Sequence, residues 1–315
     1  MSIRPGTVVG GHRIVGTLGA GGNSTVYLAK HPRLDRNVAL KVAHKDSATQ
    51  ADVRTAFDRE VRLISALSHP NIIDIYDRNG PGDEYLWMSM RLIYGGDLTD
   101  LIATAPDGVD PHLAVRLIAD TARALDYAHT RNTLHRDVKP ANILIDKHPG
   151  GVTAVLSDFG IASALDVAAT DSDVLASLAY TAPERFSAHH RIDSRADVYS
   201  LGCTLFQLLT GEVPYPARHP GAAVAAHLRT RVPSVCARRV GLPAALDEVI
   251  ATALAKDPDD RFRTCAELAA HAANTVTPTG RHAVALLRSG AVPSDHATRV
   301  PVRRADNVES RQLML

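Results

Sequence analysis

The sequence contains little cysteine, and the few cysteines are far apart. Cys203, Cys236 and Cys265 are the three cysteines among 315 residues, too few and too dispersed for a disulfide framework or a zinc knuckle. Cys203 lies in an apolar helical pattern, which favours a buried thiol. The 15 histidines show no HExxH or paired His/Cys spacing, which argues against a metal site built from them.

The sequence also lacks a strong net charge and a long apolar run. The formal net charge of +1 gives no global field that would attract nucleic acid or a membrane. The longest uncharged apolar run, 198–211, is shorter than the roughly 18 residues that a membrane helix needs, and the N-terminus shows no signal-peptide pattern. We therefore expect no nucleic-acid partner, no membrane span in this chain and a reduced, cytoplasmic location.

The first part of the chain, about 11–94, has the pattern of strands and turns. The stretch 12–29 is typical of two strands around a glycine turn, 37–43 of a third strand and 85–94 of a further one. Between them an amphipathic helix is predicted over 52–68 from apolar residues at steps of three and four, namely Val53, Phe57, Val61, Ile64 and Leu67.

After Gly95 the periodicity becomes helical. Amphipathic patterns cover 110–130 and 243–258, while 196–211 is apolar on nearly all faces, which predicts a buried central helix. Beyond about residue 273 the apolar period fades into a mixed, flexible composition. The expected architecture is a small strand-rich lobe followed by a larger helical lobe.

The glycine-rich stretch Gly19–Val26 could let backbone N–H groups approach a phosphate closely. Taken alone, such a turn is better explained as a plain hairpin. However, Lys41 follows inside an apolar strand, and a buried lysine is costly unless it is paired; the alternative is a strand-edge lysine whose amine reaches water. Glu60, on the apolar side of the predicted helix, is the expected partner, and the pair could orient a polyphosphate.

The stretch "HRDVKPAN" concentrates polar residues just before an apolar run. Asp137 and Asn142 are five residues apart, and Asp158 follows sixteen residues after Asn142. Asn142 and Asp158 offer the oxygen ligands that Mg²⁺ prefers. Asp137 could accept a proton from a hydroxyl nucleophile, and Lys139 could neutralise charge on a transferring phosphoryl group. A polar turn that only caps the preceding helix is the alternative, which the ordered series of elements argues against.

These motifs, in this order, resemble those of a eukaryotic-type (Hanks-type) bacterial Ser/Thr protein kinase, close to the actinobacterial members. The resemblance covers about 10–273 and extends to "DFG" at Asp158, "APE" at Ala182–Glu184, "DVYSLG" at Asp197 and "DPDDRF" with Arg261. It implies an α+β, bilobal protein kinase fold. The β-rich N-lobe with one regulatory helix would span about 10–93, the mainly α-helical C-lobe about 95–273, and a flexible basic tail 274–315.

The resemblance also implies the roles of individual residues, with ATP and Mg²⁺ as cofactors and Mn²⁺ as an alternative ion. Asp137 would be the catalytic base, supported by Lys139, Lys41 and Glu60, and the metal ligands would be Asn142 and Asp158. The implied nucleotide-binding residues are Leu18, Gly19, Ala20, Gly21, Gly22, Asn23, Ser24, Val26, Ala39, Lys41, Met90, Arg91 and Ile93. A structural role is implied for His135, Arg136, Glu184, Asp197 and Arg261.

Three positions depart from the common family pattern. Ser24 replaces the third glycine of the loop, although bacterial relatives also carry serine there. Arg91 follows the expected gatekeeper, Met90, where an acid is common, and the backbone atoms of Arg91 and Ile93 would contact adenine. Ser177 stands where many relatives have threonine, and a contact with the substrate hydroxyl is expected for it.

The acidic stretch before "APE" suggests regulation. We expect autophosphorylation at Thr170 or Ser172, with Ser177 as the less favoured site, and with Arg136 pairing with the added charge; solubilising loop hydroxyls are the alternative. The expected partners are protein substrates with Ser or Thr, and a homodimer through the N-lobe is left open. Two further alternatives are left open. The chain could be the intracellular part of a longer membrane-anchored kinase, or it could be a nucleotide-binding pseudokinase or scaffold.

Overall fold

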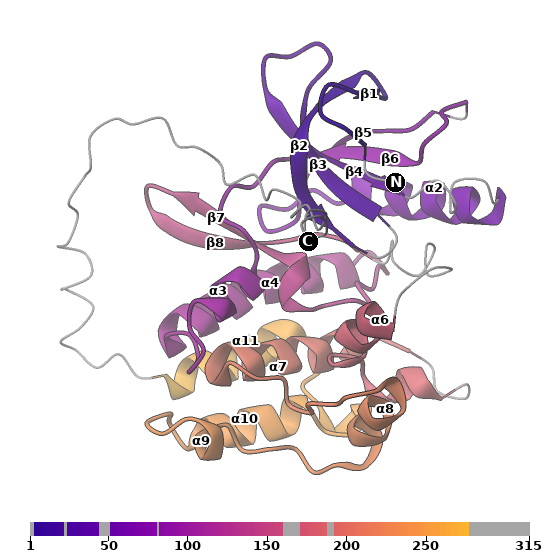
Figure 1. Ribbon diagram of the computed structural model, residues 1–315. Helices are drawn as coiled ribbons and strands as arrows, with labels where there is room; N and C mark the ends of the chain where they lie inside the picture. Colours follow the sequence, from indigo (N-terminus) through magenta and orange to yellow (C-terminus); the bar gives the residue numbers. More distant parts are fainter. Residues whose placement is uncertain are drawn as a thin grey trace, which may run out of the picture.

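In the computed structural model the chain forms two lobes, an upper one built on a β-sheet and a lower one built from helices (Figure 1). The structure describes residues 3–21, 24–43, 51–80, 82–159, 171–187 and 192–276. The upper lobe contains β1 (Val8–Val9), β2 (His12–Ala20), β3 (Ser24–Lys30), β4 (Asn37–Ala43), α2 (Ala51–Ser65), β5 (Ile75–Arg78) and β6 (Trp87–Met90).

The lower lobe begins after the crossing segment that follows β6. Its elements are α3 (Leu98–Ala103), α4 (Pro111–His129), η1 (Pro140–Asn142), β7 (Ile143–His148), β8 (Gly151–Leu156), α6 (Asp171–Leu178), η3 (Pro183–Phe186), α7 (Arg195–Thr210), α8 (Pro220–Arg229), α9 (Val235–Arg238), α10 (Ala245–Ala253), η4 (Pro258–Asp260) and α11 (Cys265–Thr275). The predicted α+β fold class, with a small sheet lobe and a larger helical lobe, is confirmed.

The strands of the upper lobe form one antiparallel sheet in the order β1-β2-β3-β4-β6-β5. The central strand β4 is buried on both faces because its side chains alternate between two apolar clusters. Val38, Leu40 and Val42 pack with Trp87 on one face, so Lys41 points to the opposite face, with Ala39. The predicted helix 52–68 corresponds to α2, which ends three residues earlier. The predicted strand 85–94 is shorter in the structure, since β6 ends at Met90.

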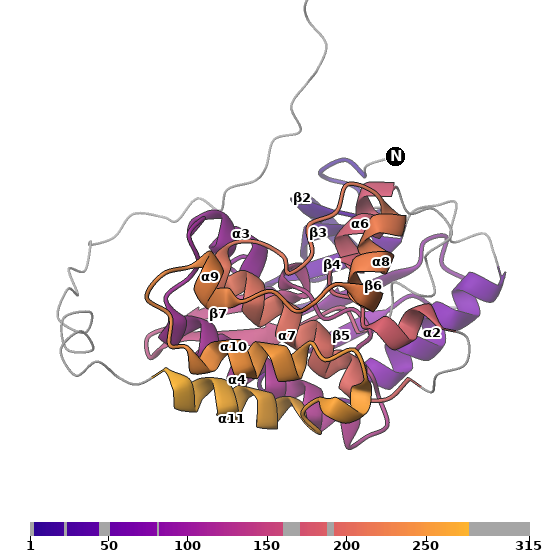
Figure 2. The ribbon, with the colours of Figure 1, turned by 90° about the horizontal axis from the view of Figure 1, so that it is seen from below.

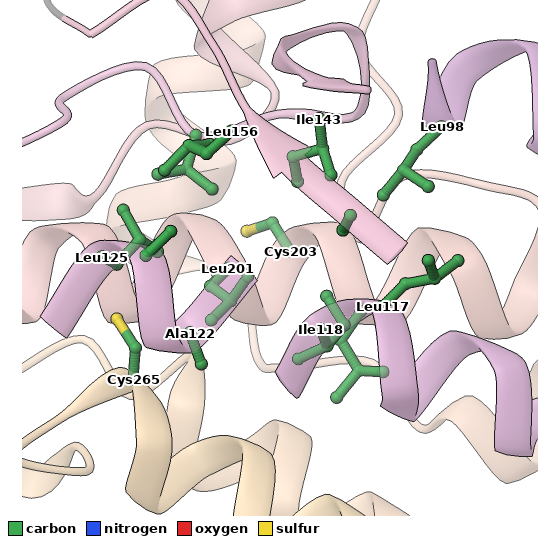
Figure 3. Close-up of a cluster of buried hydrophobic side chains, with 14 of the residues drawn as sticks. Leu98, Leu117, Ile118, Ala122, Leu125, Ile143, Leu156, Leu201, Cys203 and Cys265 are labelled. Atoms are coloured by element: carbon green, nitrogen blue, oxygen red, sulfur yellow. The ribbon is translucent and has the colours of Figure 1, made fainter. Parts of the chain in front are cut away.

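The core of the lower lobe lies between α4, α7 and α11. Figure 3 shows Leu117, Ile118 and Leu125 of α4 facing side chains of α7 and α11. As predicted, α7 is buried almost all round, and it ends at Gly211, whose φ of 79° suits glycine. Cys203 is fully buried on α7, which confirms the interpretation of a buried thiol. From below, α11 lies along α4 and α10 (Figure 2).

The hairpin β7–β8 joins the two lobes along both of its edges. On the β8 edge, Ile73 of the upper lobe donates its backbone N–H to Leu156, at 2.9 Å. On the β7 edge, Ile145 donates to the carbonyl of Gly96, at 2.9 Å. Residues immediately before β7 and after β8 therefore meet beneath the sheet. Within the described residues, no helix has both the length and the apolar character to cross a membrane.

Candidate active site

The loop between α4 and β7 is held by the buried carboxylate of Asp197 on α7. The backbone N–H groups of His135 and Arg136 each donate to this carboxylate, at 2.9 Å. Arg136 has a φ of 66°, which is unfavourable for a residue with a side chain. Two hydrogen bonds to one buried charge therefore fix a loop shape that the chain would not favour alone.

A charged histidine extends this anchor to the end of α4. His129 donates a ring N–H to Asp197 at 2.7 Å, and Asp126 lies 3.7 Å from its other ring nitrogen. Burial disfavours the imidazolium, but these two carboxylates outweigh it and raise the pKa of His129 to about 9. Burial likewise opposes ionisation of Asp197, yet the His129 hydrogen bond keeps the pKa of that carboxyl below its ordinary value. Since Asp126 also accepts from the N–H groups that begin α11, at Cys265 and Ala266, the anchor connects three helices.

Asp137 lies at the centre of a hydrogen-bonded group. Asn142 donates its amide to the Asp137 carboxylate at 2.9 Å, and Lys139 forms an ion pair with the same oxygen at 2.8 Å. The hydroxyl of Ser177, at the end of α6, accepts from Lys139 at 2.8 Å and donates to Oδ1 of Asp137 at 3.3 Å. The structure thus brings Asp137, Lys139, Asn142 and Ser177 together, with a serine hydroxyl beside the carboxylate.

Asn142 and Asp158 are brought together by the hairpin, because one precedes β7 and the other follows β8. Ser157 donates both its backbone N–H and its hydroxyl to the Asn142 carbonyl, at 2.9 and 3.1 Å. Lys41 reaches from β4 to the Asp158 carboxylate, at 2.7 Å. Burial raises the pKa of Asp158, but the Lys41 ammonium more than offsets this, and the net shift is downward. Asp158 is therefore charged at neutral pH.

This pair of side chains fits a hard divalent cation. The amide nitrogen of Asn142 is engaged by Asp137, which leaves the amide oxygen as the atom that could act as a ligand. Asp158 contributes a charged carboxylate whose Oδ1 contacts Lys41. An amide oxygen and a carboxylate, with no sulfur or imidazole between them, form the donor set that Mg²⁺ prefers.

A cluster of packed apolar side chains lies between β3, β4 and β6 of the upper lobe and the β7–β8 hairpin. We define the apolar slot as buried Ala39, Ile73, Met90 and Val155 with the partly buried side chains packed on them, Val26, Leu92, Ile93 and Leu144. The backbone N–H of Arg91 donates to the Asp74 carbonyl at 2.9 Å. Backbone atoms of Arg91 were expected to contact adenine, and this hydrogen bond leaves the Arg91 carbonyl as the atom that could do so.

The turn between β2 and β3 has room beside its backbone. Gly21 donates to the Ser24 carbonyl at 2.9 Å. Among the residues that the structure describes, a Cβ at Gly19 would meet no atom within 4 Å, and one at Gly21 only the Ser24 carbonyl oxygen, at 3.6 Å. Packing within the protein therefore does not require these glycines, and the open space is what a phosphate would need. Leu18 and Ala20, on the same strand, are exposed.

Several expected positions lie outside the described residues. They are Gly22, Asn23, Thr170 and the side chains of Glu60 and Ser172, so the pairing of Lys41 with Glu60 stays a prediction. The expected ion pair of the lower lobe is present, since Arg261 forms two hydrogen bonds with Glu184, both at 2.8 Å. Both side chains are buried.

Sequence reasoning missed residues that only the fold brings to the site. Leu144 closes the apolar slot from below, although it stands two residues after Asn142 and its alternation with buried Ile143 and Ile145 was visible. Asp97 pairs with Leu144 across an isolated antiparallel bridge, and its carboxylate caps α3 by accepting from the backbone N–H groups of Thr99 and Asp100. Burial raises the pKa of Asp97. Asp97 begins a capping box with Asp100, a pattern visible in the sequence, but its pairing with Leu144 depends on the path of the chain after β6.

The fold and this site together define the class of protein. The protein kinase domain family matches residues 12–272, and the chain belongs to the protein kinase family. The crystal structure of the PknI kinase domain of Mycobacterium tuberculosis is similar, with a TM-score of 0.68 and 33% sequence identity over 87% of this chain and all of that one.

The relatives narrow the class to serine/threonine kinases. The serine/threonine-protein kinase PknJ of Mycobacterium tuberculosis is 48% identical over 85% of this chain and 46% of its own length. The kinase PknF of the same species is 40% identical over 85% of this chain and 57% of its own length. The predicted membership in the bacterial Hanks-type Ser/Thr kinases is confirmed. The chain spans about half the length of these curated relatives, and the family uses ATP with a divalent metal ion.

Proposed function

We propose that this chain transfers the γ-phosphoryl group of ATP to Ser or Thr hydroxyls of proteins in bacterial signalling. The observation that supports this most is the placement of the Ser177 hydroxyl, 3.3 Å from Asp137 Oδ1 and 2.8 Å from the Lys139 ammonium. A carboxylate that already accepts a hydrogen bond from an alcohol, next to a cation, is suited to a hydroxyl nucleophile.

In the proposed reaction each charged group has one task. Asp137 accepts the proton of the substrate hydroxyl as its oxygen bonds to phosphorus and the bond to ADP breaks. Lys139 neutralises negative charge on the transferring phosphoryl group, and Lys41 binds the phosphates of ATP. Mg²⁺ held by Asn142 and Asp158, with Mn²⁺ as the alternative, would supply further positive charge to the phosphates.

The base of ATP is assigned to the apolar slot. Its ring would pack between Val26 and Ala39 above and Leu144 below, and the Arg91 carbonyl and Ile93 N–H would provide its hydrogen bonds. The glycine turn, residues 19–24, would cover the phosphates, and Glu60 would orient Lys41.

The test compares wild type with Asp137→Asn, each incubated with Mg-ATP and followed by intact mass and by transfer to a protein substrate. We expect turnover to fall by about 10²- to 10⁴-fold, with ADP affinity within twofold of wild type. Asp107→Asn, an exposed substitution on the loop after α3, is the matched control and should be fully active. If ATP raises the melting temperature of wild type but no phosphate is transferred, the chain is instead a nucleotide-binding pseudokinase or scaffold.

We further propose activation by autophosphorylation at Thr170 or Ser172. Two cations support this. The Arg136 side chain is exposed, and the Arg185 guanidinium contacts the Arg136 carbonyl, so two cations lie close together at the loop that the proposal pairs with a phosphate. Phosphopeptide mapping of active enzyme should find either site modified and Ser177 unmodified; two unmodified sites would contradict the proposal.

The organisation of the whole protein is also a proposal. We propose a kinase domain of about 10–273 followed by a basic tail, 274–315, in the cytoplasm, either as such or as the intracellular part of a longer membrane-anchored kinase. A homodimer through the upper lobe is the proposed assembly. Limited proteolysis tests the boundary between domain and tail. Cell fractionation tests the location, and light scattering tests the homodimer.

A further inference from the structure

The segment that joins the lobes, which we call the hinge (residues 91–97), is pressed against β7. Ile145 donates its N–H to Gly96, and Asp97 pairs with Leu144. A Cβ at Gly95 would stand 1.9 Å from the Ile145 carbonyl oxygen, so no other residue fits there without displacing the strand. The hinge backbone and β7 thus behave as neighbouring strands at this point.

An ion pair links the first residue of the hinge to β7. The guanidinium of Arg91 binds the carboxylate of Asp146 on β7, while the backbone N–H of Arg91 is held by Asp74. The side chains of Arg91 and Asp146 are 34% and 24% exposed. At this partial burial the desolvation cost of the two charges is small, and water does not fully screen their attraction. The ion pair therefore ties the first residue of the hinge to the lower lobe.

The position of Asp146 on β7 relates this ion pair to the apolar slot. Side chains two residues apart on a strand share a face, so Leu144 and Asp146 lie on one face of β7, opposite buried Ile143 and Ile145. Leu144 forms the lower wall of the slot. Arg91, which stands between the slot residues Met90 and Leu92, is thus bound to a side chain on the same face of β7 as Leu144.

We propose that the Arg91–Asp146 ion pair is a positioning device that sets the spacing between the hinge backbone and Leu144, and so tunes the affinity of the slot for a purine ring. This inference rests on the proposed function, because it assigns the adenine of ATP to the apolar slot. Neither side chain needs to touch the nucleotide. Their effect should fall on the base and not on the phosphates, which the proposal assigns to Lys41 and the glycine turn.

The chain provides a matched control for the loss of one ion pair. Arg78 pairs with Asp58 at 2.6 Å, and these side chains are 34% and 22% exposed, nearly the same values as for Arg91 and Asp146. This second pair joins β5 to α2, and neither residue belongs to the apolar slot. Arg91→Met and Arg78→Met should lower the free energy of unfolding by similar amounts, whereas only Arg91→Met should weaken adenosine binding.

The experiment measures binding of adenosine, ADP and inorganic tripolyphosphate, with Mg²⁺ present for the latter two, to wild type, Arg91→Met, Asp146→Asn, the double variant and Arg78→Met of the full chain. For both single variants we expect adenosine and ADP to bind about three- to tenfold more weakly, as for loss of one partly buried ion pair, and tripolyphosphate to change less than twofold. The double variant should lose no more than the weaker-binding single variant, because the two residues act as one unit. At saturating ATP, kcat of Asp146→Asn should stay within twofold of wild type.

Three outcomes would count against this inference or its basis. Unchanged adenosine affinity, with a melting temperature lowered as in Arg78→Met, would overturn it in favour of a purely stabilising pair. Equal weakening of tripolyphosphate and adenosine would overturn it in favour of a general effect on the two lobes. If the wild-type protein binds no adenine ligand, the proposed function is refuted instead. This outcome is seen in the wild-type titration, before any variant is measured.

Discussion

The loop of residues 134–142 and the apolar slot are neighbouring regions that are held in place by different forces. In the loop, directional hydrogen bonds converge on the buried carboxylate of Asp197. In the slot, apolar side chains from both lobes pack without directional contacts. A buried charge has no substitute when its partner is removed, whereas apolar packing adjusts in steps of about one methylene group. Substitutions in the loop should therefore act nearly all-or-none, and those in the slot by degrees.

The largest effect is expected for Asp197→Ala. The substitution leaves the His129 imidazolium and two backbone N–H groups without their acceptor, so the free energy of unfolding should fall by about 3–5 kcal/mol. Urea denaturation measures this loss. Asp107→Ala, which removes an exposed carboxylate, should change stability by less than about 0.5 kcal/mol.

If Asp197→Ala does not fold, Asp197→Asn keeps one oxygen acceptor and should show a smaller loss. A loss below about 1 kcal/mol in Asp197→Ala would mean that the loop does not depend on this anchor.

The next effect is the pH dependence that His129 contributes. The pKa of His129 is about 9 in the folded protein, above the ordinary value of 6.5, so the folded state holds the proton more tightly than the unfolded state. This stabilisation is fully present below pH 6.5 and is lost as the pH rises through 9. For a side chain that is 11% exposed, its size is about 2–3 kcal/mol.

Comparison of wild type with His129→Gln isolates this contribution. Lys256 has an opposite effect, because burial lowers its pKa from 10.5 to about 8, but it is present in both proteins and cancels in the difference. Unfolding free energies measured from pH 6 to 9 should converge as the pH rises. Parallel curves would show that His129 is not the charged link between Asp126 and Asp197.

Sequence patterns predicted the loop far better than the slot. The loop is one continuous stretch, so the order Asp137, Lys139, Asn142 can be read directly from the sequence, and the apolar periodicity of 196–211 anticipated the helix that carries Asp197. The slot takes its residues from five separate segments, and Leu144 enters it only because β7 pairs with the hinge in one register. The contact of Arg91 with Asp146 depends on that same register. Pairing between distant segments leaves no local periodicity, and so Leu144 and the contact between Arg91 and Asp146 were missed, although the resemblance had named Val26, Ala39, Met90, Arg91 and Ile93.

A smaller, graded effect is expected for Leu144→Ala in the slot. Loss of the isobutyl group beneath the base should weaken ADP binding about three- to tenfold and leave tripolyphosphate binding and kcat at saturating ATP within twofold. Calorimetric titration measures both ligands. Leu101→Ala, a partly buried leucine on α3 that packs against the core of the lower lobe, is the control and should lower stability without a change in ADP affinity. An all-or-none loss of activity in Leu144→Ala would remove the distinction between slot and loop.

The smallest effect on stability is expected for Gly19→Ala, and it sharpens the same distinction within the upper lobe. Gly19 does not have a positive φ, and a Cβ there meets none of the described atoms within 4 Å, so unfolding free energy should stay constant or rise by up to about 1 kcal/mol. The added methyl group would fill the space assigned to a phosphate, so tripolyphosphate and ATP should bind a few-fold more weakly while adenosine is unaffected.

Gly10→Ala is the opposite case and serves as the control. Gly10 has a φ of 53°, and its Cβ would lie 2.1 Å from the Trp87 ring, so this substitution should destabilise by about 1–3 kcal/mol with ligand affinities unchanged. The two glycines would then separate a requirement of the fold from a requirement of the ligand. If Gly19→Ala instead destabilised the protein and left tripolyphosphate binding intact, the open space beside the β2–β3 turn would not be a phosphate site.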